Sequence, residues 1–168
     1  GYYFIHPFDG PLTLQGSATL GLEIVEYLKS INTKIDNLLI SVGGGGLISG
    51  VSSYIKQFYP KIRIIGVEPE NANGLSQSFI ANKPLNNVKV NSIADSLSAP
   101  LHMQYSFDVA KEVIDEMVTV SDDQMKEFMI FCFKQFKLFL EPACVAGLAA
   151  LKYKINNELN GKNTMVIL

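Results

Sequence analysis

Apolar residues follow two spacings along the chain, one helical and one extended. Between residues 17 and 30 they recur every three to four positions, which predicts an amphipathic helix. Residues 37–42 and 62–67 are nearly continuous apolar runs, which are typical of buried strands. A helical pattern that ends near residue 58 lies between the two runs. The three segments therefore predict a strand–helix–strand unit whose strands are parallel.

The remaining elements follow from the same patterns and from turn residues. We expect strands at residues 2–6, 117–120 and 164–168, and helices at 75–81, 102–113, 121–139 and 143–151. Ser121-Asp-Asp-Gln124 is a capping box at the start of one helix, and Pro142 suits the first turn of the next. Residues 6–11 and 82–100 contain the prolines, asparagines and serines of loops. This order of elements predicts an open α/β sheet.

Four consecutive glycines, at residues 43–46, separate the strand at 37–42 from the helix that follows it. Glycine loses the most conformational entropy on folding, so a run of four is expected only where side chains would be in the way. One such place is a turn whose backbone N–H groups converge on an anion at the start of a helix. We therefore predict a phosphate-binding turn at residues 43–47. The alternative is a flexible hairpin loop, which would need neither the apolar strand before it nor the helix directly after it.

Composition narrows the class of protein. The chain has 168 residues, of which 48% are hydrophobic and 18% charged, and this predicts one globular domain with a sizeable core. With a net charge of −2, the chain lacks the excess of basic residues that is typical of a nucleic-acid-binding protein. No apolar run approaches the roughly 20 residues of a membrane span, and no signal-peptide pattern occurs. Cys132 and Cys144 lack metal-ligand spacing and predict free thiols. We expect a cytoplasmic protein with neither nucleic-acid nor membrane partners.

Seven motifs occur in order along the chain: HPFD at residues 6–9, GSATLGLE at 16–23, SVGGGGLISG at 41–50, GVEPENA at 66–72, SIADSL at 92–97, VTVSDDQM at 118–125 and EPACVAGLAAL at 141–151. Together they resemble the serine/threonine dehydratases, which are pyridoxal-phosphate enzymes of fold type II and relatives of serine racemase. The resemblance implies pyridoxal 5'-phosphate as the cofactor and a mostly parallel twisted sheet with flanking helices in the larger of two domains. It also implies a homodimer or homotetramer at full length.

The resemblance further implies a reaction. A threonine/serine ammonia-lyase (dehydratase) converts L-threonine or L-serine to a 2-keto acid and ammonia by β-elimination, and the cofactor ring takes up the electrons left by the α-proton. A serine or aspartate racemase of the same family is an alternative. Residues 1–168 would form the C-terminal part of the catalytic domain, as a fragment truncated at both ends.

The resemblance assigns cofactor contacts to three segments. The phosphate loop of the family matches Gly43, Gly44, Gly45, Gly46 and the backbone of Leu47. Glu141 matches a carboxylate near the cofactor ring, although it is equally a candidate for the N-cap of its helix. Asp95 lies in the segment that matches the mouth of the active site, and Ser96 stands where many relatives have glycine.

A divalent-cation site and a catalytic lysine are two further features of the family. Glu68 and the carbonyl of Ala72 match the cation site, but Gly74 replaces its third ligand, an aspartate. One carboxylate and one carbonyl are fewer oxygen ligands than a hard cation needs. The Schiff-base lysine of the family stands in a Ser-Phe-Lys motif, which this chain lacks. We therefore expect no catalytic residue within residues 1–168 and no activity from this chain alone.

Two alternatives outside the family remain open from the sequence. Gly44, Gly46 and Gly50 follow a strand, and Glu68 ends the next strand about 20 residues on, as in a nucleotide-binding Rossmann unit. Against that interpretation, the usual third glycine position is Ser49, and a complete strand and helix precede the glycine turn. The other alternative is a non-catalytic remnant that has kept the fold as a binding module.

Overall fold

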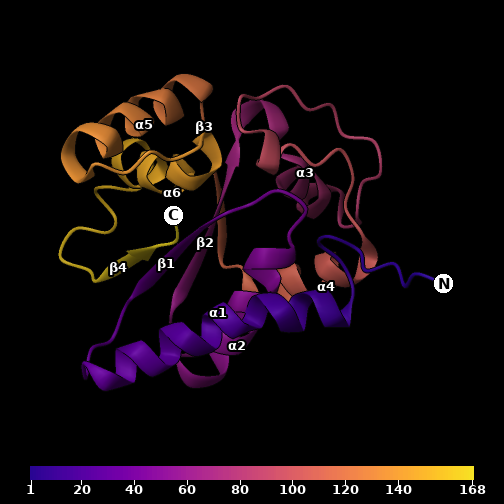
Figure 1. The fold of residues 1–168 in the computed structure, drawn as a ribbon, viewed down its shortest axis with the longest axis horizontal. Coiled ribbons are helices and arrows are strands. Elements are labelled where there is room, and N and C mark those ends of the chain that lie inside the picture. The colour runs from indigo at the N-terminus through magenta and orange to yellow at the C-terminus, as the bar shows by residue number, and fades with distance from the viewer.

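A four-stranded sheet lies between two layers of helices in the computed structural model, which describes residues 1–168 (Figure 1). The strands are β1 (Asn37–Ser41), β2 (Arg63–Pro69), β3 (Glu116–Val120) and β4 (Thr164–Val166). Their order across the sheet is β3-β2-β1-β4, and every neighbouring pair is parallel. The predicted open, parallel α/β sheet is thereby confirmed.

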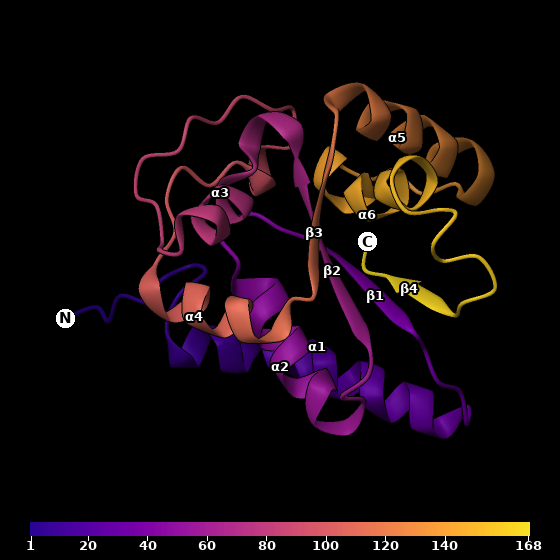
Figure 2. The same cartoon turned by 180° about the vertical axis from the view of Figure 1, so that it is seen from behind.

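Helices cover both faces of this sheet (Figures 1 and 2). They are α1 (Pro11–Ser30), α2 (Gly46–Phe58), α3 (Gly74–Ala81), α4 (Gln104–Val113), α5 (Asp122–Phe136) and α6 (Pro142–Tyr153). Two short 3₁₀ segments, η1 (Glu70–Ala72) and η2 (Asp95–Leu97), lie in the connections. Helices α1, α2 and α4 lie on one side of the sheet, and α5 and α6 lie on the other. None of the six helices has the length and apolar character needed to span a membrane.

The uninterrupted apolar runs of β1 and β2 supply two cores at once. Successive side chains of a strand point to opposite faces of the sheet. Leu38 and Ile40 therefore pack with α1 and α2, whereas Leu39 and Ile65 pack with α5 and α6. All four side chains are fully buried. Burial of such a side chain stabilises the fold by about 1.5–3 kcal/mol, so both layers of helices are firmly attached to the sheet.

The largest differences from the sequence prediction are one absent strand and the ends of two helices. The strand expected at residues 2–6 is wrong, because this segment pairs with no other strand and Tyr2 is fully exposed. Aromatic and β-branched residues favour a strand only where a partner is available. Helix α1 already begins at Pro11, whose fixed φ suits a first helical turn. Helix α5 ends at Phe136, because Lys137 adopts a left-handed conformation with φ of 60°.

The connections of the sheet diverge at β1. From β1 the chain passes through α2 to β2 on one side, whereas β4 pairs with the other side of β1. Ligands of open α/β sheets bind where the strand order reverses, at the carboxyl ends of the strands. The glycine turn directly follows β1, and Ile167 and Leu168 directly follow β4. The fold therefore predicts a binding site between these two segments.

Candidate functional site

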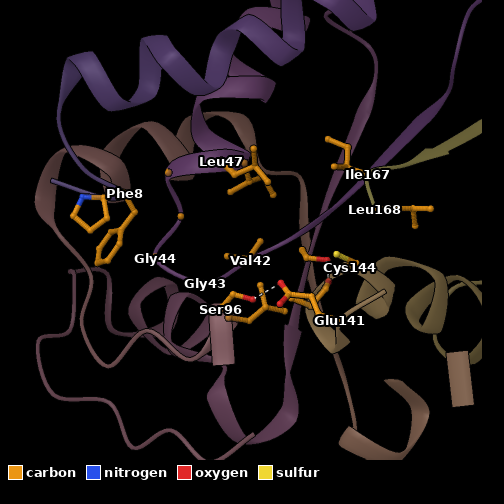
Figure 3. Close-up of a pocket in the computed structure, with 17 residues that line it drawn as sticks. Phe8, Val42, Gly43, Gly44, Leu47, Ser96, Glu141, Cys144, Ile167 and Leu168 are labelled. Atoms are coloured by element: carbon orange, nitrogen blue, oxygen red, sulfur yellow. Dashed lines mark hydrogen bonds between the residues drawn. The ribbon is translucent and has the colours of Figure 1, made fainter. Parts of the chain in front are cut away.

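A cavity of about 420 Å³ lies at the carboxyl ends of β1 and β4 (Figure 3). Pockets of about 300–1,000 Å³ are typical of sites for small molecules and cofactors. The segment before α1, the glycine turn, η2, the start of α6 and the residues after β4 all contribute to the lining. The predicted phosphate turn is thus part of the binding site that the topology offers.

The residues of the glycine turn line this cavity, and their backbone N–H groups are unpaired. No N–H group from Gly43 to Ile48 donates a hydrogen bond within the chain, and the first that does is Ser49, to the carbonyl of Gly45 at 3.0 Å. Gly45, Gly46 and Ile48 are buried, and buried amides without a partner are rare in folded proteins. The N-terminal dipole of α2 adds positive potential at the same place. These residues fit a phosphate group.

The turn needs glycine because other parts of the chain press against it. A Cβ atom on Gly44 would lie 2.2 Å from Cγ of Phe8, and one on Gly43 would lie 2.8 Å from the carbonyl oxygen of Ser96. Gly45 has a φ of +91°, in the left-handed region that L side chains rarely adopt. A side chain here would therefore collide with neighbouring segments or strain the backbone, whereas bare glycines leave the N–H groups free to bind.

Glu141 faces the same cavity from the start of α6. It occupies the N-cap position, but its side chain makes no capping hydrogen bond. Instead, its Oε1 accepts a hydrogen bond of 2.9 Å from the hydroxyl of Ser96, and both residues line the cavity (Figure 3). The N-cap hydrogen bond is therefore absent, and the role of the Glu141 carboxylate near a cofactor stays a prediction. Asp95 is exposed and does not line the cavity, so its predicted contact with a cofactor stays a prediction.

Glu68, half of the predicted cation site, is buried and already hydrogen-bonded. Its Oε1 accepts from the N–H of Leu75 at 2.7 Å, and its Oε2 accepts from the N–H and the hydroxyl of Ser76 at 3.0 and 2.5 Å. Burial raises the pKa of the Glu68 carboxyl, and these hydrogen bonds oppose the rise. The carboxylate therefore caps the start of α3. A cation at Glu68 and Ala72 would have to displace these donors, and the cation site stays a prediction.

Three side chains near the glycine turn were not predicted from the sequence. Phe8 packs against Gly44, Cys144 lines the cavity from the first turn of α6, and His102 contacts Gly43. Phe8 belongs to the HPFD motif, which is a signal that could have found it. His102 lies 59 residues from Gly43 in the sequence, so only the folded chain brings the two together. Both cysteines are free thiols, as predicted.

Comparison with protein families and curated proteins agrees with this geometry. The model of a family described as "Pyridoxal-phosphate dependent enzyme" matches residues 1–168. Phenylserine dehydratase of Ralstonia pickettii is 42% identical over 168 residues, which is all of this chain and 50% of the relative. The chain thus spans about half the length of the curated relatives it matches.

Solved structures share the fold over nearly the whole chain. A threonine deaminase from T.th. superposes with a TM-score of 0.89 at 30% identity, over 98% of this chain and 55% of that protein. Maize serine racemase superposes with a TM-score of 0.86 at 31% identity, over 97% of this chain and 51% of that protein. The fold of nearly the whole chain therefore has counterparts in enzymes of known structure.

Proposed function

The chain belongs to the pyridoxal-phosphate-dependent enzyme family, and from that premise we propose that it forms part of a dehydratase acting on L-threonine or L-serine. The products are a 2-keto acid and ammonia. The observation that carries the proposal is the row of unpaired N–H groups from Gly43 to Ile48, at the start of α2 and on the wall of the cavity. The names of two relatives, a phenylserine dehydratase and a threonine deaminase, support the same reaction.

Pyridoxal phosphate, when bound, supplies a ring that takes up the electrons left when the α-proton of the amino acid departs, and the β-hydroxyl can then leave. The role of the residues of this chain would be to bind the cofactor and to orient it. The N–H groups of the glycine turn would hold the phosphate of the cofactor and so orient the site for the substrate. Glu141 presents a carboxylate to the cavity, and the hydroxyl of Ser96 holds that carboxylate in place.

The proposal includes how this chain relates to the complete enzyme. No lysine lines the cavity. We propose that residues 1–168 are the C-terminal part of the catalytic domain and that the lysine which binds the cofactor lies elsewhere in the full-length protein. The relatives are about twice as long as this chain, which supports a further part of the protein outside residues 1–168. We also propose a cytoplasmic homo-oligomer, in line with the metabolic reactions named for the relatives.

Two other functions receive less support. A racemase would use the same cofactor site, and maize serine racemase shares the fold at 31% identity. A dehydratase is favoured because the 42% identical curated relative carries that name. The nucleotide-binding alternative needs Glu68 to bind a ribose. That carboxylate is fully buried and bonded to Leu75 and Ser76, so it is not available to a ligand.

The test uses the full-length protein with pyridoxal phosphate. L-Threonine, L-serine and phenylserine are supplied separately, and the 2-keto acid and ammonia are measured in the same samples. We expect both products in equal amounts from at least one of the three. Inversion of serine without release of ammonia would instead identify a racemase. A full-length protein that binds no pyridoxal phosphate would overturn both the dehydratase and the racemase interpretation.

A further inference from the structure

His102 is buried directly behind the glycine turn, outside the cavity. Only 4% of the residue is exposed, and its Nε2 lies 3.1 Å from the carbonyl oxygen of Gly43. Its own backbone N–H donates to the carbonyl of Leu85 at 2.7 Å, which anchors the segment before α4. The imidazole also contacts Gly74, where a Cβ atom would lie 2.6 Å from Cε1 of His102. The ring is therefore held in place on two sides.

The hydrogen bond to Gly43 determines the tautomer of His102. A carbonyl oxygen can only accept, so Nε2 carries the hydrogen and donates it. Nδ1 then has no hydrogen, and it has no hydrogen-bond partner within the chain. Burial lowers the pKa of the His102 imidazole, which agrees with a neutral ring at pH 7. His102 is therefore a fixed neutral donor to the turn.

Holding the Gly43 carbonyl also fixes the N–H group of Gly44. The two groups belong to one planar peptide unit and point in opposite directions. Because both flanking residues are glycines, this peptide unit could rotate more easily than one flanked by residues with side chains. With the carbonyl directed at His102, the N–H of Gly44 points away from His102, and Gly44 lines the cavity.

We propose that His102 is a positioning residue for cofactor binding: it fixes the peptide unit between Gly43 and Gly44 so that the Gly44 N–H group stays directed at the phosphate. The proposal rests on the proposed function, because it assumes that the turn binds the phosphate of pyridoxal phosphate. His102 itself does not touch the ligand. Its effect is confined to the phosphate end of the cofactor, and this confinement makes the proposal testable.

The experiment measures the affinity of the full-length protein for pyridoxal phosphate and for pyridoxal, which lacks the phosphate. His102→Leu removes the donor and keeps a side chain of similar bulk. We expect it to weaken binding of pyridoxal phosphate about tenfold or more and to leave binding of pyridoxal nearly unchanged. His102→Gln, whose amide N–H can replace Nε2–H, is the matched control and recovers most of the lost affinity. A role in packing alone would weaken both ligands equally and would not be rescued by Gln.

Two outcomes overturn the inference, and both differ from failure of the proposed function. One is a His102→Leu variant that prefers pyridoxal phosphate over pyridoxal as strongly as the wild type does. The other is a crystal structure of the wild-type holoenzyme in which the Gly43 carbonyl does not face His102. This second test needs no variant, so it holds even if the substitutions prevent folding. If the wild type itself does not prefer pyridoxal phosphate over pyridoxal, the proposed function fails instead.

Discussion

Helices α2 and α6 both begin at the cavity, but their first turns offer it opposite charges. The first turn of α2 contains no acidic residue and no side chain that caps it, and its N–H groups are unpaired. Helix α6 begins with Glu141 at the N-cap and Pro142 at the next position. Proline has no N–H group to offer, and the carboxylate already supplies the negative charge that a helix N-terminus favours.

This difference assigns different ligand groups to the two ends of the cavity. An anion is stabilised at α2, whereas at α6 it would meet Glu141 and be repelled. Helix α5 shows a third arrangement, because Ser121 and Gln124 form a capping box that satisfies its first N–H groups internally. Of the starts of α2, α5 and α6, only that of α2 therefore has neither a side-chain cap nor an acidic residue that would compete with an anion.

The start of α2 differs from that of α6 only while the glycine turn keeps its shape, because this shape leaves its N–H groups unpaired. Gly44→Ala places a methyl group 2.2 Å from Cγ of Phe8, so the turn or Phe8 must move. We expect the free energy of unfolding to fall by about 1–3 kcal/mol. The affinity for pyridoxal phosphate should fall about tenfold or more, because the N–H groups move with the turn. Urea denaturation and cofactor titration measure the two effects.

The matched control is Gly16→Ala, the same substitution in an open position. A Cβ atom on Gly16 meets nothing within 4 Å, and Gly16 lies inside α1. Alanine is about 1 kcal/mol better than glycine in a helix, so this variant should be as stable as the wild type or more stable. If Gly44→Ala behaves in the same way as Gly16→Ala, Phe8 does not press against the turn as described.

An acid placed at the start of α2 would sharpen the contrast, because it gives α2 the charge that α6 already has. Leu47, in the first turn, is 41% exposed and lines the cavity. Leu47→Glu should favour the helix by about 0.3–1 kcal/mol through the dipole. It should nevertheless weaken binding of pyridoxal phosphate about tenfold or more, because two anions then share one helix start.

Leu47→Gln is the control, because glutamine has the length of glutamate without its charge. It separates repulsion between the carboxylate and the phosphate from the loss of an apolar contact. Thermal unfolding without cofactor measures the effect on the helix, and cofactor titration measures the effect on the ligand. Equal affinities of the Glu and Gln variants would mean that the phosphate does not bind at α2.

The parts of the site that are local in sequence could be predicted from it. The glycine turn at residues 43–47, the capping box that starts at Ser121 and the start of α6 at Pro142 each depend on a few neighbouring residues. Local chemistry also explains the error at residues 2–6. Their composition favours a strand, but whether a strand forms depends on a partner, and that is a property of the whole fold.

The contacts that give the turn its shape could not be predicted in this way. Phe8 approaches the turn from the segment before α1, and Ser96 and His102 approach it from the connection between α3 and α4. Each contact depends on the β1-centred topology, which brings these segments together. The bond between Ser96 and Glu141 is of the same kind, because the two residues lie 45 positions apart. Pattern and motif thus predicted which turn could bind a ligand, whereas the folded structure was needed to find the contacts that hold this turn in position.

Ser96→Ala tests whether the two ends of the cavity act independently, and it should have a smaller effect on cofactor affinity than Gly44→Ala or Leu47→Glu. It removes the 2.9 Å hydrogen bond to Glu141, and both residues are exposed, so the free energy of unfolding should fall by no more than about 1 kcal/mol. Affinity for pyridoxal phosphate should stay within about twofold of wild type, because the proposed phosphate site is at α2, whereas the Ser96 hydroxyl bonds to Glu141 at α6. The rate at saturating cofactor should fall several-fold, since Glu141 is then free to rotate. If Ser96→Ala instead lowers cofactor affinity as much as Gly44→Ala does, the starts of α2 and α6 form one coupled site, and the division of labour between them is wrong.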